Sequence, residues 1–350
     1  MLSRVADNLY WMARYLERTE NLARLVDVSA GLMLDLPPRL SPGWQPLVKI
    51  TGNDSLYAEQ ERDYSEKSAV RFIVANPKNP GSMMTSIARA REIARTVRDI
   101  LPREVWEQIN DLYLYVGEHA AEASARRTRY GFLGRVISST RALTGTFEGI
   151  FNEGDALSFL TLGRNIERAD MTSRIVDVRA AAMMTGPSAA QLGAFETVLW
   201  MGVLRSLSGY QMYRLKTRER VYGAGVVRFL LADEQFPRAC VCCLRRAEDV
   251  LHRLPNSEPL LRRVSRMRRA IHHTRFETLE QGELHEFIDR LQVSLARTND
   301  ELARIYFVGH SAEQTDVVPI LPYQGQGQSQ SQNQPANKPA NKPANKQITA

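Results

Sequence analysis

Residues 15–28 read YLERTENLARLVDV, and residues 165–178 read NIERADMTSRIVDV. When segments 8–28 and 158–178 are aligned without a gap, they share seven identities, and the charged ones keep one spacing. We interpret the pair as an internal duplication. The charged residues common to both copies form our candidate polar or binding site: Arg14, Glu17, Arg18, Arg24 and Asp27 in the first, and Arg164, Glu167, Arg168, Arg174 and Asp177 in the second.

The shared residues are predicted to form one stripe along a helix. Each residue advances by about 100° around a helix, so Glu17, Glu20 and Arg24 fall on one half of the cylinder. Large apolar side chains, among them Leu16 and Leu22, take the other half. Residues three or four apart on a helix can meet. This predicts four pairs within the helices: Arg14–Glu17, Glu20–Arg24, Arg164–Glu167 and Asp170–Arg174.

Two interpretations of the stripe remain open. In the first, the pairs are exposed ion pairs on long helices, each stabilising its helix by about 0.2–0.5 kcal/mol. In the second, the two helices face each other about a pseudo-twofold axis, and Glu17 and Glu167 share a polar cleft lined by arginines. Such a network would have to be kept whole, because burying one Glu without its Arg costs several kcal/mol.

Periodicity along the rest of the chain predicts an all-α fold. Apolar residues recur at helical spacing over 3–36, 131–150, 188–216, 220–233, 237–253, 257–276 and 283–307, and a further helix follows Asp155. Residues 39–81 are expected to hold one or two short helices. We predict two tandem helical bundles related by the internal repeat, at 1–150 and 155–310. Residues 324–350, with QGQGQSQSQNQ and PANK repeats, predict a disordered low-complexity tail.

Composition describes an ordinary globular chain of 350 residues, with 43% hydrophobic residues and a net charge of +7. No apolar run is long enough to span a membrane, and the first residues do not resemble a signal peptide. Cys240, Cys242 and Cys243 form an odd cluster, which predicts small buried residues rather than disulfides. A cytoplasmic location is therefore expected. The basic run at 260–276 lacks interleaved aromatic residues for base stacking, so nucleic acid is not an expected partner.

Several kinds of chemistry lack their sequence signals. No phosphate-cradling loop occurs, no Glu-x-x-His pair suits a di-iron bundle, and no Gly-x-Ser-x-Gly elbow suits a hydrolase. We expect neither a metal nor a cofactor.

Four blocks of the chain, in order, resemble the bacterial alpha-E domain family, which is named for a helical motif with a characteristic Glu usually followed by Arg. The resemblance covers about residues 1–307, and its motif positions here are Glu17 with Arg18 and Glu167 with Arg168. The blocks are MLSRVADNLYWMARYLERTENLARLVDV (1–28), NPKNPGSMMTSIARAREIARTVRDILPREVWEQIN (76–110), SFLTLGRNIERADMTSRIVDV (158–178) and FLLADEQFPRACVCCL (229–244).

The resemblance also implies a functional setting. Members of this family are typically encoded beside, or fused to, circularly permuted ATP-grasp proteins and transglutaminase-like proteins. This implies an accessory or substrate-binding helical subunit of an ATP-grasp-linked peptide ligation or modification system, with a peptide as substrate. Two alternatives stay open: an enzyme that uses the paired glutamates as acid and base, and a purely structural helical scaffold. Whether the chain is itself an enzyme is not decided by the sequence.

Overall fold

The computed structural model describes residues 1–37, 41–184 and 189–307, with side chains described outside 182–194. This part of the chain is helical and contains no strand, as the periodicity predicted. The predicted disordered tail, 324–350, lies outside it. The helices are α1 (Ser3–Asp35), α2 (Gln45–Ile50), α3 (Asp54–Gln60), α4 (Glu66–Val74), α5 (Met83–Thr96), α6 (Arg103–His119), a 3-10 turn η1 (Ala120–Ser124), α7 (Arg126–Ile150), α8 (Asp155–Met184), α9 (Ala189–Ser206), α10 (Tyr210–Thr217), α11 (Gly223–Ala232), α12 (Cys240–Leu251), α13 (Glu258–His273) and α14 (Gln281–Tyr306).

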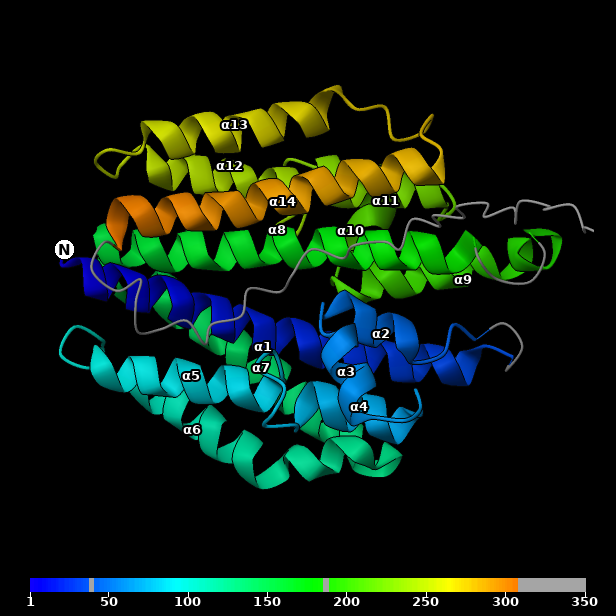
Figure 1. Cartoon of the computed structure of the whole chain (residues 1–350), viewed down its shortest axis with the longest axis horizontal. Helices are drawn as coiled ribbons and strands as arrows, with labels where there is room; N and C mark the ends of the chain where they lie inside the picture. The colour runs from blue at the N-terminus through cyan, green and yellow to red at the C-terminus, as the bar shows by residue number, and fades with distance from the viewer. Residues whose placement is uncertain (38–40, 185–188, 308–350) are drawn as a thin grey trace, which may run out of the picture.

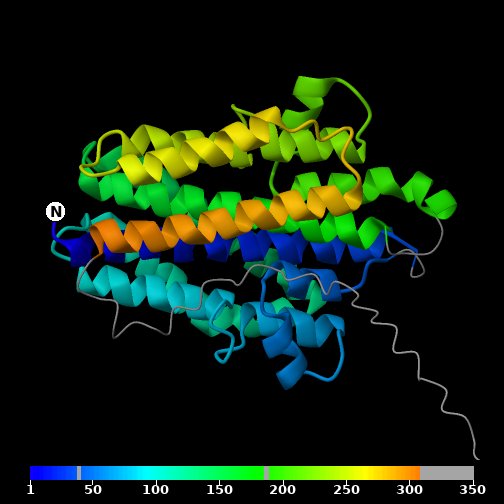
Figure 2. The same cartoon turned by 45° about the horizontal axis from the view of Figure 1, so that its top comes forward.

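The two helices that carry the repeated segments lie side by side at the centre of the molecule. Figures 1 and 2 show α1 in blue and α8 in green, with α5, α6 and α7 beyond α1 and α12, α13 and α14 beyond α8. The α1–α8 contact is the most extensive between any two described helices. Both the apolar and the charged half of α1 are buried around its middle. The stripe therefore faces protein rather than solvent, which excludes the interpretation as exposed pairs.

Most helices of 1–150 lie on the α1 side of this contact and most of those of 155–307 lie on the α8 side (Figure 1), but α2 also packs against α8 and α9 packs against α1. One cluster of buried apolar side chains runs through both sides. The division into two bundles and the internal duplication remain predictions.

Gly163 marks a close approach of α8 to α1. A Cβ atom at this position would lie 2.2 Å from the carbonyl oxygen of Tyr10 and 3.2 Å from the Cβ of Ala13. No side chain larger than hydrogen fits that space without displacing backbone. This glycine therefore lets the two helices come close enough for their charged stripes to meet.

Two predicted segments differ from the structure. Residues 39–81 hold three helices, α2, α3 and α4, rather than one or two. The predicted helix 188–216 is broken between α9 and α10, where Ser208 takes a left-handed backbone conformation with φ 54°. The amide of Gly209 there donates to the carbonyl of Leu204 at 2.7 Å. Helical periodicity continued across this turn because both flanking helices bury apolar side chains.

None of the helices in the described ranges is both long enough and apolar enough to cross a lipid bilayer.

Candidate functional site

The Glu-Arg dipeptides of α1 and α8 meet at the helix contact and exchange partners. The carboxylate of Glu167 accepts from Nε of Arg18 at 2.6 Å and from Nε of Arg14 at 2.8 Å. Glu17 in turn lies 2.9 Å from Nε of Arg168. Each motif Glu is thus paired with the motif Arg of the other helix. This reciprocity is what contact about a pseudo-twofold axis produces.

A further arginine completes the site at Glu17. Nη1 of Arg238 donates to Glu17 at 2.6 Å and to Asn21 at 2.8 Å, and its Nη2 donates to Glu20 at 2.8 Å. Glu20 also accepts from Arg24, one turn along α1. These two groups of ion pairs adjoin at the Glu-Arg dipeptide of each helix; we call them together the Glu–Arg clasp, and no member is more than 8% exposed. Its members are Arg14, Glu17, Arg18, Glu20, Arg24, Glu167, Arg168 and Arg238.

Arg238 was not among the candidate residues from the sequence. It lies in the connection between α11 and α12, where the Asp233 side chain accepts from the amides of Gln235 and Phe236 at 2.8 Å each. The hydroxyl of Thr172 on α8 donates a hydrogen bond to the Arg238 carbonyl at 2.8 Å. The sequence contains one weak indication of its role: Arg238 falls within the fourth block, residues 229–244, that carries the family resemblance.

The within-helix pairs were predicted only in part. Glu20–Arg24 and Asp170–Arg174 are present, as predicted. The pairing of Arg14 with Glu17 is wrong, because Arg14 crosses to Glu167, where it meets a carboxylate shared with Arg18. The pairing of Arg164 with Glu167 is also wrong. Nη2 of Arg164 lies 2.8 Å from Glu148 of α7, because Glu167 is occupied by the arginines of α1.

The two repeated aspartates lie outside the clasp. Asp27 follows Glu17 by ten residues, a rise of about 15 Å along the helix. It lines a separate surface pocket that also contains Tyr130. Asp177 pairs instead with Nδ1 of His285 at 2.8 Å. The structure therefore brings six of the ten candidate site residues together in the clasp and leaves four outside it: Asp27, Arg164, Arg174 and Asp177.

Comparison with protein families gives this geometry a context. The model of a family described as a predicted alpha-helical domain with a conserved ER motif, Alpha-E, matches residues 1–307. The chain belongs to the Alpha-E family. Its clasp is centred on two ER dipeptides, Glu17-Arg18 and Glu167-Arg168.

Uncharacterised proteins of Mycobacterium bovis and Mycobacterium tuberculosis are similar to this Alpha-E chain. Each is 25% identical over 327 residues, which cover 85% of this chain and 36% of the relative. The chain thus spans about a third of the length of these relatives. No solved structure matches it.

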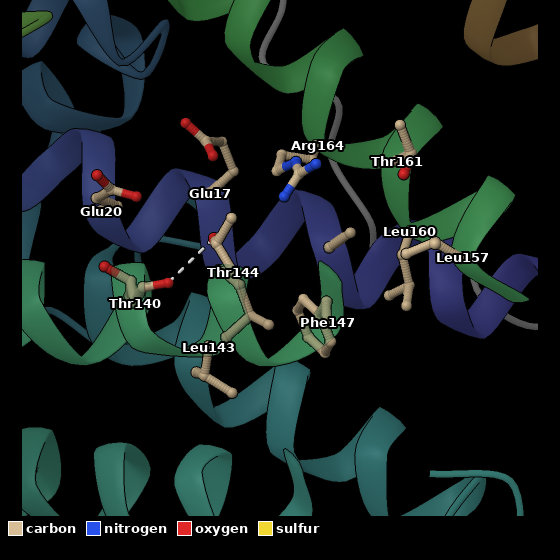
Figure 3. Close-up of a pocket in the computed structure, with 12 residues that line it drawn as sticks. Glu17, Glu20, Thr140, Leu143, Thr144, Phe147, Leu157, Leu160, Thr161 and Arg164 are labelled. Carbon is tan, nitrogen blue, oxygen red and sulfur yellow. Dashed lines mark hydrogen bonds between the residues drawn. The ribbon is translucent and has the colours of Figure 1, made fainter. Parts of the chain in front are cut away.

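A pocket adjoins the clasp between α1, α7 and α8 of the Alpha-E chain (Figure 3). Glu17, Glu20 and Arg164 form its polar wall, and apolar side chains including Leu143 and Phe147 form the opposite wall. The glutamate carboxylates at this wall are already bound by arginines. The pocket therefore borders the clasp without giving a ligand access to a free carboxylate.

Both motif glutamates are held in the ionised form. Burial by itself raises the pKa of Glu167, but Arg18 and Arg14 outweigh it and lower the pKa to about 2. Burial likewise opposes ionisation of Glu17, and Arg168 and Arg238 reverse the effect, so its pKa is also lowered. A general acid at neutral pH needs a raised carboxyl pKa, which is the opposite arrangement.

Acid should weaken the clasp as the pH falls from 4.5 towards 2. Because the pKa of Glu167 falls from 4.5 to about 2 on folding, its ionisation stabilises the fold above pH 4.5. That contribution, on the order of 3 kcal/mol, is lost as pH falls from 4.5 towards 2. In urea unfolding, the stability gap between wild type and Glu167→Gln should narrow over this range. Parallel stability profiles of the two proteins would contradict an ionised, paired Glu167.

The three cysteines are free and buried, as predicted. Burial raises the pKa of Cys243 to about 12, so its thiol is protonated and poorly reactive. Among the residues described, no group of three or more His, Cys, Asp and Glu side chains is arranged to hold a metal ion.

Proposed function

We propose that this Alpha-E chain is a non-catalytic accessory or peptide-binding subunit of a cytoplasmic, ATP-grasp-linked peptide ligation or modification system. The observation that carries the non-catalytic part is the state of the motif glutamates. Each is buried, ionised and bound by two arginines. Acid–base catalysis by this pair would need a carboxyl group that is accessible and titrates near neutral pH.

The accessory role is supported by the way Alpha-E sequence occurs in longer chains. In the mycobacterial relatives, most of the protein lies outside the region that this chain matches. An Alpha-E unit in such a chain works beside other polypeptide. The identity of the partners, an ATP-grasp protein and a transglutaminase-like protein, rests on the family resemblance. Free buried cysteines fit the cytoplasmic location of the proposal.

A structural scaffold is the second candidate, and the buried clasp favours it. In that case the clasp would only lock the two halves of the chain together. The scaffold and the accessory subunit share the same stable core and differ in whether a partner is bound.

Native pull-down separates these functions. The tagged full chain is co-expressed with a circularly permuted ATP-grasp protein, the partner class that the family resemblance implies, and we expect the two to be recovered together, with peptide ligation requiring both. Recovery of the chain alone would reject the accessory role and favour the scaffold. Glu17→Gln is assayed in parallel. Loss of ligation with unchanged melting temperature and unchanged partner recovery would instead indicate that the glutamate acts in catalysis.

A further inference from the structure

The clasp contains more positive than negative charge. Its five arginines face three glutamates, all of them buried. The neighbouring pairs, Asp170–Arg174 and Glu148–Arg164, are each neutral and leave this excess unchanged. Two positive charges are therefore not matched by a carboxylate of the cluster. Buried charge without compensation is costly, so an anion bound at the edge of the clasp would stabilise it.

The excess charge reaches solvent at one corner of the molecule. Nη1 of Arg24 and Nη2 of Arg141 both donate to the hydroxyl of Ser208, the latter at 3.3 Å. Arg141 belongs to α7, and its side chain is 56% exposed. Ser208 is also exposed, in the turn between α9 and α10. Two guanidinium groups thus converge on one neutral oxygen that is open to water.

The carboxylate that both arginines approach, Glu20, is already shared. Glu20 accepts from Arg24 and Arg238, and Nε of Arg141 lies 3.7 Å from the same Oε1 atom. Burial lowers the pKa of Arg24, and the charges of Arg238 and Arg141 lower it further against the opposing effect of Glu20. The corner therefore keeps a positive potential that Glu20 does not neutralise.

The turn fixes the position of the hydroxyl. The left-handed conformation of Ser208 and the bond from the Gly209 amide to Leu204 hold the backbone. A Cβ atom on Gly209 would lie 3.0 Å from the ring of Phe236, so the turn is packed closely against the connection to α12. The Ser208 hydroxyl is consequently presented to both arginines by a well-anchored segment.

We propose that Arg24, Arg141 and Ser208 form an oxyanion-binding site at the solvent-facing end of the clasp. Its ligand is a carboxylate or phosphate group, because the planar guanidinium fork binds both through paired, charge-assisted hydrogen bonds. A hydroxyl donor beside the two arginines completes such a site. In the proposed accessory role the natural source is a peptide carboxylate, and that identification rests on the proposed function.

Calorimetric titration of the full chain tests the site. The probes are inorganic phosphate, acetyl-trialanine with a free carboxylate, and the same peptide as its C-terminal amide, at matched ionic strength in chloride. Arg141→Met removes an exposed guanidinium and should weaken oxyanion binding by about 10- to 100-fold, the loss of one charge-assisted contact. Arg127→Met removes an exposed arginine elsewhere on α7 and should bind as wild type does.

Each outcome decides the question. Binding of the free-acid peptide but not its amide or phosphate identifies the ligand as a carboxylate, and binding of phosphate alone identifies a phosphate. Equal affinity in wild type and Arg141→Met, or no binding of any probe by wild type at millimolar concentration, overturns the site. Partner recovery is measured separately. A chain that keeps its ATP-grasp partner but binds no oxyanion therefore rejects this site and leaves the proposed function standing.

Discussion

Replacing Glu167 by glutamine should lower the free energy of unfolding by about 3–5 kcal/mol, the usual result of removing one partner from a buried ion pair. Glutamine keeps the size of the side chain but removes the charge that compensates Arg14 and Arg18. Both guanidinium groups would then remain buried without a counter-charge at this point. Urea-induced unfolding followed by circular dichroism at pH 7 measures the loss.

A surface pair of the same composition provides the control. Glu107 pairs with Arg103 on α6, where both side chains are at least half exposed. Surface pairs of this kind contribute about 0–1 kcal/mol, so Glu107→Gln should change the stability little. If the two variants lose stability equally, the clasp is not a buried, mutually dependent network.

Replacing Gly163 by alanine should destabilise the protein by about 3 kcal/mol or more, at or above the upper end of ordinary overpacking. The added methyl group would lie 2.2 Å from the Tyr10 carbonyl, so α1 and α8 would have to separate. Separation would also lengthen the contacts between the motif Glu and Arg residues. Thermal unfolding should therefore show a lower melting temperature.

Gly134 gives a matched control for the same substitution. It lies within α7, and a Cβ atom there would meet nothing within 4 Å. Gly134→Ala should stabilise the protein by about 0.5–1 kcal/mol, because alanine favours the helical conformation. We therefore expect the stability to fall in Gly163→Ala and to rise in Gly134→Ala. A neutral or stabilising Gly163→Ala would show that the helices do not approach as closely as described.

The fold class was predictable because helical periodicity is a local property. The helix predicted over 3–36 is present as α1 (Ser3–Asp35), since its apolar spacing and the prolines after it are both visible in the sequence. Its burial on both halves was not predictable. A charged stripe has the same spacing whether it faces water or another helix.

The candidate site was predictable as a set of residues but not as a set of contacts. The duplication singled out Glu17 and Glu167, and in the structure each of them pairs with the motif arginine of the other helix. The pairing of arginines with glutamates depends on how α1 packs on α8. A local sequence pattern does not predict that packing. Arg238 is separated from Glu17 by more than 200 residues and has no counterpart in the repeated segments.

The central claim is that Arg18 and Glu167 interact directly across the α1–α8 contact. A double-mutant cycle extends the Glu167→Gln measurement with Arg18→Met and the combined variant, all at pH 7. We predict a coupling free energy of roughly 2–3 kcal/mol, within the range for contacting residues, so that the double variant is markedly more stable than the sum of the single losses implies. Additive losses, within about 0.5 kcal/mol, would contradict the clasp.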